Sequence, residues 1–211
     1  MQQVILIFFG WVLGVFSSII LENKKRKQAK EDYRESLFTE IDLVYPRIVC
    51  TYYSVINEMG ELNKENLEWI RNIIIKKNSN LLYDVNDAVE EMLKHDDKEI
   101  KLLNSKHDYS RTLLLKKFNL SFLEENISSF SLLDKKLRFN AIRLRTNINY
   151  LNDSIDKVDY FHRTYFVPDL PKENYKTAYI NIKKYYINIK DLCKSTSEMI
   201  VSLQEKSKKV Y

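Results

Sequence analysis

The stretch LRFNAIRLRTNINYLNDSIDKVDYFHRTY, residues 137–165, decides the fold. Mostly apolar residues recur in it at alternating steps of four and three, beginning at Leu137 and ending at Tyr165. Such steps place side chains on one face of an α-helix, and their near-heptad spacing suits packing against a second helix. The stretch therefore predicts one long amphipathic helix with a buried seam.

A second stretch with the same spacing follows. Its apolar steps run from Tyr175 to Leu203, and residues 168–171, Pro-Asp-Leu-Pro, separate the two stretches. Proline cannot continue a helix, so the chain should turn there, and Asp134 is a suitable N-cap for the first helix. We expect an antiparallel αα-hairpin with coiled-coil-like seams over about residues 134–209.

Glycine and proline are scarce in the chain. Its 211 residues include three of each, and Gly60 is the only glycine outside the apolar N-terminus. A β-rich domain would need many tight turns, whereas 45% hydrophobic and 30% charged residues are typical of a folded domain. The sequence predicts an all-α fold, an up-and-down helical bundle closed by the hairpin.

The N-terminus predicts a membrane anchor. Residues 4–21, VILIFFGWVLGVFSSIIL, are uncharged. As a helix of 18 residues they would span about 27 Å, close to the roughly 30 Å of a hydrocarbon core. A cleaved signal peptide is the rival interpretation, but it would need cations before this run and a small-residue cleavage site after it. We therefore expect an uncleaved transmembrane helix over residues 1–22.

A basic collar follows the apolar run. By the positive-inside rule it places the N-terminus outside and the remainder in the cytoplasm, and it can contact anionic headgroups. Residues 1–30 carry a balance of +4 out of a total of +5, so the rest of the chain is nearly neutral and no nucleic-acid partner is expected. The layout is typical of single-pass proteins of the bacterial inner membrane. The collar residues are Lys24, Lys25, Arg26, Lys27 and Lys30.

Three segments make up the expected domain organisation. Residues 1–22 form the anchor, residues 23–60 the collar and a stem helix, and residues 61–211 the cytoplasmic bundle. Gly60 is a plausible C-cap of the stem, and Asn63 a plausible N-cap of the next helix. An acidic helix should follow over residues 81–93. For residues 96–133 the sequence pattern does not predict definite helices or strands.

Small residues recur along the anchor. Gly10, Gly14 and Ser18 are four residues apart and share one helix face, which can let a second helix approach closely. The alternative is that glycine is simply common in membrane helices. Self-association through this face is therefore one of two open interpretations.

A cationic run lies on the first hairpin helix. Lys135, Lys136, Arg138, Arg143 and Arg145 have no acid among them. One interpretation is an anion-binding or partner face, since arginine suits phosphate. The other is a solvated face, or an internal partner for the acidic stretch at residues 84–99, where seven acids face two lysines.

His162 occupies a seam position with Asp159 three residues before it. Di-metal sites in bundles use two carboxylate-x-x-His pairs, and a second pair is missing from this sequence. A partly buried histidine without a metal is the favoured interpretation. The sequence contains no Gly-rich phosphate loop, HExxH or GxSxG motif, so no catalytic, metal or cofactor residues are predicted.

The leading functional hypothesis is a non-enzymatic, membrane-tethered scaffold that holds a cytoplasmic partner at the inner membrane. Tethering raises local concentration and can replace intrinsic affinity. A self-associating membrane effector, of the stress or phage-defence type, is the first alternative. A ligand-binding sensor that uses the face from Arg138 to Arg145 is the second.

Overall fold

The computed structural model describes residues 2–77, 82–105, 113–165 and 171–208, without the side chains of residues 2–10, 12, 77, 105 and 205–208. Every described element is helical, which confirms the all-α prediction. The helices are α1 (Gln2–Glu58), α2 (Lys64–Lys77), α3 (Tyr83–Leu93), α4 (Asp97–Ser105), α5 (Ser121–Glu125), the 3-10 helix η2 (Ile127–Leu132), α6 (Lys135–Tyr165) and α7 (Lys172–Lys208).

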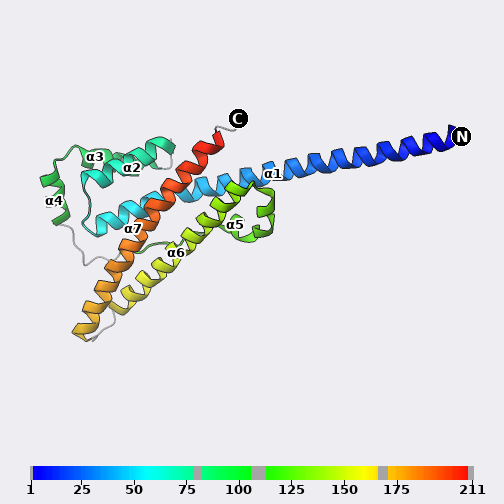
Figure 1. Ribbon diagram of the computed structural model, residues 1–211. Helices are drawn as coiled ribbons and strands as arrows, with labels where there is room; N and C mark the ends of the chain where they lie inside the picture. The colour runs from blue at the N-terminus through cyan, green and yellow to red at the C-terminus, as the bar shows by residue number, and fades with distance from the viewer. Residues whose placement is uncertain (1, 78–81, 106–112, 166–170, 209–211) are drawn as a thin grey trace.

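Helix α1 has two different halves. Figure 1 shows its C-terminal half packed among the other helices, whereas its N-terminal half projects away from them. The buried seam begins at Tyr33 and continues through Leu37 and Ile41 at helical spacing. The 57-residue helix runs through Pro46 without a break.

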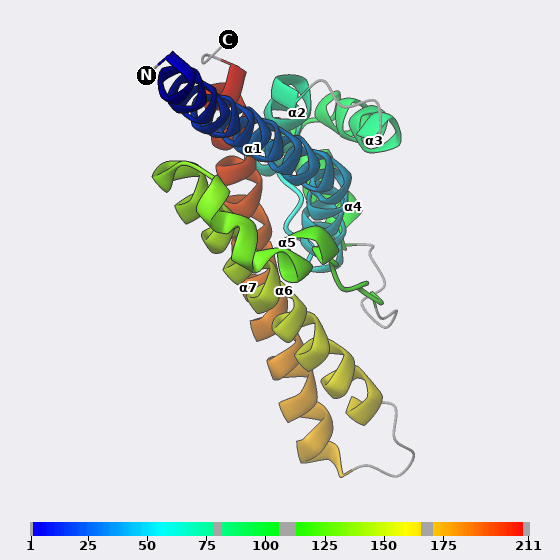
Figure 2. The same ribbon diagram turned by 90° about the vertical axis from the view of Figure 1, so that its right-hand side faces the viewer.

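The predicted hairpin is confirmed. Helices α6 and α7 lie side by side and antiparallel (Figures 1 and 2), and α7 also packs along the C-terminal half of α1. Asp134 caps α6 as expected, because its Oδ1 accepts hydrogen bonds from the backbone N–H groups of Lys136 (3.1 Å) and Leu137 (2.9 Å). The predicted turn at residues 168–171 lies outside the described residues except for Pro171.

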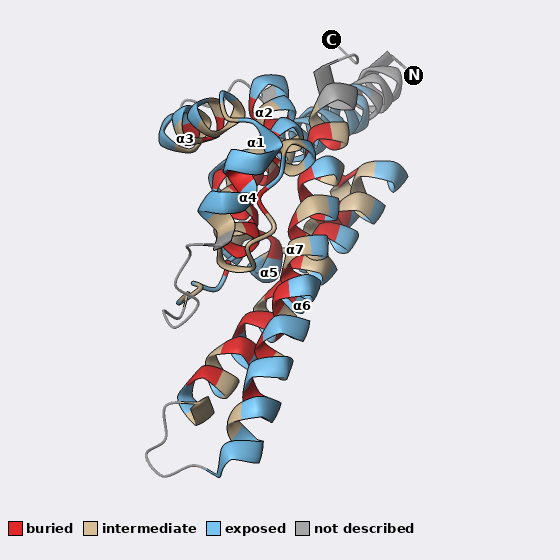
Figure 3. Ribbon diagram, turned by 90° about the vertical axis from the view of Figure 1, so that its left-hand side faces the viewer, coloured by how far each residue is buried: buried red, intermediate tan, exposed pale blue. Residues whose placement is uncertain are grey.

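The core lies where α1, α2 and α7 meet. Figure 3 shows the buried residues on the inward sides of these helices and along the α6–α7 seam. The rings of Tyr52 and Trp69 are 4.6 Å apart, and the Tyr52 hydroxyl donates to Asn66 Oδ1 at 3.0 Å. Trp69 Nε1 donates to Glu198 on α7 at 3.0 Å. These contacts join three helices into one helical bundle.

The turn between α1 and α2 follows the expected capping pattern. Gly60 has a φ of 64°, a left-handed conformation that glycine adopts without steric cost. The Gly60 and Glu61 N–H groups bond to the carbonyls of Asn57 (3.1 Å) and Ile56 (2.8 Å), which is a Schellman C-cap. Asn63 caps α2 through the Asn66 N–H at 2.9 Å.

The later part of the region without predicted elements, residues 113–133, packs onto α1 and α6. Asn152 binds the backbone of Phe118 on both sides: its Nδ2 donates to the Phe118 carbonyl and its Oδ1 accepts from the Phe118 N–H, each at 2.8 Å. Arg47 on α1 donates to the Lys117 carbonyl at 2.7 Å. The segment before α5 therefore depends on side chains that are distant in sequence.

The predicted transmembrane span finds no support in the structure. Among the residues that the structure describes, no helix combines the length and the apolar content that crossing a membrane requires. The anchor at residues 4–21 remains a prediction from sequence.

Candidate functional site

The projecting part of α1 carries an exposed apolar surface. From Trp11 to Leu21, every described side chain is exposed, including Trp11 at 67% and Ile20 at 65%. Their positions are distributed around the helix rather than along one stripe. The large apolar side chains in this group are Trp11, Leu13, Val15, Phe16, Ile19, Ile20 and Leu21.

The small-residue face of α1 is open at its two described positions. A Cβ atom added at Gly14 would meet no atom within 4 Å, and Ser18 is exposed. The side-chain position of Gly10 lies outside the described residues. Among the described residues nothing occupies the face at Gly14, so a second helix could approach it there.

The collar residues are all exposed and follow directly on the same helix. Four positions, Asn23, Arg26, Lys27 and Lys30, are spaced at three, four and seven residues from the first and therefore share one helix face. That face continues three residues later into the buried seam at Tyr33. Two of the collar cations, Lys24 and Lys25, lie off this face.

A pocket of about 280 Å³ lies between this face and η2. It forms because α5 and η2 pack on α1 at the place where α1 leaves the bundle (Figure 1). The Tyr33 hydroxyl donates to the Asn126 carbonyl at 3.1 Å, and the Tyr33 ring lies 4.9 Å from that of Phe122. We call this site the collar pocket; it is lined by Asn23, Arg26, Lys27, Lys30, Ser131 and Leu132.

The cationic run on α6 is not gathered into one site. Lys135 and Arg143 are exposed, whereas Arg138 and Arg145 are partly buried one heptad apart. Arg145 Nε is buried without a hydrogen-bond partner among the described residues. The acidic helix α3 packs on α2, and α6 packs on α7, so their packing does not follow the expected charge matching.

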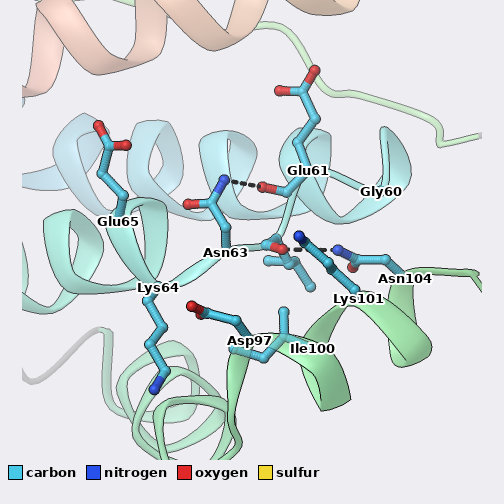
Figure 4. Close-up of a pocket in the computed structure, with 10 residues that line it drawn as sticks. Gly60, Glu61, Asn63, Lys64, Glu65, Asp97, Ile100, Lys101 and Asn104 are labelled. Atoms are coloured by element: carbon cyan, nitrogen blue, oxygen red, sulfur yellow. Dashed lines mark hydrogen bonds between the residues drawn. The ribbon is translucent and has the colours of Figure 1, made fainter.

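A second pocket, of about 420 Å³, lies where the α1–α2 turn meets α4 (Figure 4). The carboxylate of Glu61 bonds to Lys190 of α7 at 2.7 Å, and Figure 4 shows it directed away from the pocket centre. Asn104 Nδ2 donates to the Leu62 carbonyl at 2.8 Å. Because its remaining charges, Glu65, Asp97, Lys64 and Lys101, are of both signs, this pocket favours no single ligand charge.

His162 is buried in the α6–α7 seam, as its position predicted, with a relative exposure of 5%. Its Nε2 lies 3.3 Å from the Tyr186 hydroxyl, and its Nδ1 has no partner among the described residues. Burial lowers the pKa of His162, and the nearby Asp159 opposes that shift. Within the described chain, no three His, Cys, Asp or Glu side chains come together as possible metal ligands.

Comparison with family models, curated proteins and solved structures found no match to this chain.

Half of the lining of the collar pocket was not predicted from the sequence. Arg26, Lys27 and Lys30 were expected as collar cations, whereas Asn23, Ser131 and Leu132 were not expected to lie beside them. Ser131 and Leu132 lie in the region without predicted elements. The available signal was the spacing of residues 23, 26, 27 and 30, which continues the stem seam toward the N-terminus.

Proposed function

We propose that this chain is a membrane-tethered, non-enzymatic interaction protein of the bacterial inner membrane. Residues 4–21 serve as the anchor, and the helical bundle presents a binding surface to a cytoplasmic protein. The observation that carries the proposal is the exposed apolar surface of α1 between Trp11 and Leu21, on the part of the helix that projects from the bundle.

A bilayer covers this surface better than a partner protein. Burying one large apolar side chain is worth roughly 1.5–3 kcal/mol, and monomeric proteins rarely expose extended apolar patches. A helix that packs on one partner needs an apolar stripe, whereas a helix in lipid is apolar on all sides. Trp11, Phe16 and Leu21 are five residues apart and therefore point in three different directions around the axis, which favours lipid.

The collar supports the proposed orientation. Its five cations directly follow the apolar run, against one acid, Glu22. Lysine and arginine near the end of a span favour the cytoplasmic side. The bundle, which follows the collar, is accordingly assigned to the cytoplasm.

Exposed side chains on the hairpin support a binding role. On α6, Phe139 is 65% exposed and Ile142 is 47% exposed, with the exposed Arg143 beside them. Aromatic and arginine side chains are enriched at protein interfaces, and an exposed aliphatic side chain beside them adds apolar area to such a surface. Tethering would raise the local concentration of a partner that binds this face.

Purification of the full chain from its native membranes in mild detergent tests the binding role. Mass spectrometry should find one cytoplasmic protein retained in stoichiometric amount, and F139S/I142S should reduce its retention. The matched control is the exposed pair Tyr179 and Ile180 on α7, changed to serine. Recovery of the chain only with itself would contradict a scaffold.

A self-associating effector is the second candidate function. The observation that favours it is the open space at Gly14 together with the exposed Ser18. A neighbouring helix of the same kind could pack closely on this face. The two functions differ in whether the anchor contributes only attachment or also assembly.

A further inference from the structure

We propose that the collar pocket binds the phosphate group of one anionic lipid and thereby fixes the bundle against the membrane surface. The inference rests on the proposed anchor at residues 4–21. It adds a specific site to a collar that could otherwise act only through diffuse charge.

The lining of the pocket matches the chemistry of a phosphate ester. Its charged side chains are Arg26, Lys27 and Lys30, and none of its six residues carries a carboxylate. Arginine can bind phosphate oxygens through two parallel hydrogen bonds, and lysine adds a compact positive charge. The Asn23 amide and the Ser131 hydroxyl can supply neutral donors.

Arg26, Lys27 and Lys30 lie on the side of α1 that faces η2, so they can form a binding site in addition to setting the membrane orientation. They occupy the face of α1 that becomes the buried seam at Tyr33, so they face η2 rather than pointing only outward. Three like charges on one face repel each other, and an anion between them would relieve that repulsion. Ser131 and Leu132 provide the opposite wall of the pocket.

The depth of the pocket favours a lipid over a free anion. Along the helix axis, the four lining residues of α1, from Asn23 to Lys30, lie about 3–14 Å beyond Leu21, at roughly 1.5 Å per residue. The headgroup layer extends about 5–7 Å beyond the hydrocarbon core on each side. With the apolar run in the core, the Asn23 end of the pocket is level with the lipid phosphates, and the long side chains of Lys27 and Lys30 can extend back toward them.

Native mass spectrometry of the full chain in mild non-ionic detergent tests the proposal. Added phosphatidylglycerol should give one saturable lipid adduct per chain, whereas phosphatidylcholine should give none. The double variant R26Q/K27Q should lose the adduct. K24Q/K25Q removes the same charge from the same collar, about 3 Å nearer the membrane, but outside the pocket, and should keep it.

A third variant tests whether lipid binding needs the cavity itself or only its positive charge. S131F leaves every cation in place and fills the cavity from η2, so it should also lose the adduct. Equal loss in both double variants, or full retention in S131F, would overturn the pocket. Displacement of the lipid by inorganic phosphate at a similar concentration would assign the site to a free anion instead. Far-UV circular dichroism confirms that each variant stays helical.

Alkaline extraction of the same proteins from vesicles distinguishes the two proposals. If the wild-type chain resists extraction but shows no phosphatidylglycerol adduct, the pocket fails and the anchor stands. If the wild-type chain is extracted, the anchor itself fails.

Discussion

Glu40 on α1 accepts a hydrogen bond of 2.7 Å from the backbone N–H of Phe122, 82 residues away. Its other carboxylate oxygen accepts from the Leu123 N–H at 3.1 Å. Together these bonds provide acceptors for two N–H groups in the first turn of α5, whose N-cap residue, Leu120, makes no side-chain hydrogen bond. One carboxylate of the stem therefore fixes α5, and η2 follows α5 directly.

Removal of this carboxylate should destabilise the bundle. E40A leaves two backbone N–H groups without acceptors, at a cost of about 1–3 kcal/mol in the free energy of unfolding. E40Q should cost less, because an amide oxygen can still accept one bond. Denaturant unfolding in mild detergent measures both changes. The exposed Glu35 lies on the same helix, and E35A is the control; equal losses in E35A and E40A would contradict the capping role.

The Asn152 side chain should be equally sensitive. N152A removes both hydrogen bonds to Phe118 and should lower the free energy of unfolding by about 1–3 kcal/mol. N149A alters an exposed asparagine one turn earlier on α6 and should change it by less than about 0.5 kcal/mol. Hydrogen exchange should show faster exchange at Phe118 in N152A only. Unchanged exchange there would contradict this account of the segment.

Burial of His162 predicts a pH dependence of stability. Because burial lowers its pKa in the folded chain, the unfolded chain binds a proton first as the pH falls below about 6.5. Stability should therefore decrease from about pH 6.5 down to the lower pKa of the folded state. Unfolding free energies at pH 7.5 and 5.5 should differ less in H162Q than in the wild type. The same difference in both proteins would show that His162 does not titrate as described.

Gly14 distinguishes a scaffold from a self-assembling effector. G14I should meet no clash with the described residues, since the added Cβ has open space. A scaffold should therefore keep both membrane attachment and its partner in G14I. An effector that assembles through this face should lose self-association, measured by cross-linking in membranes, whereas the control L13I should retain it. Loss of assembly and partner together in G14I would favour the effector.

The sequence predicted the helices that have periodic seams. The steps from Leu137 to Tyr165 gave α6, and Asp134, Gly60 and Asn63 marked its start, the end of α1 and the start of α2. These features are local, because period and capping depend on residues within a turn of each other. The capping box at Asp96 and Glu99, which begins α4, is equally local, although no helix was predicted there.

The remaining structure depended on distant partners. Nothing near Phe118 indicates that Asn152 binds its backbone, and nothing near α5 indicates that Glu40 caps it. Ser131 likewise lies beside the collar only because α5 and η2 pack on α1, a contact between segments that are distant in sequence. Such contacts join residues that are far apart in the sequence and that share no periodic pattern. They therefore cannot be predicted from the local sequence around either residue.

Alkaline carbonate extraction of the full chain from membranes tests membrane tethering most directly. The wild-type chain should stay in the pellet, K24Q/K25Q should also stay there, and L13K/F16K should move into the supernatant. Both substituted positions of the last variant are exposed on α1, so the bundle should remain folded. Release of the wild-type chain by carbonate would contradict the anchor and the function proposed from it.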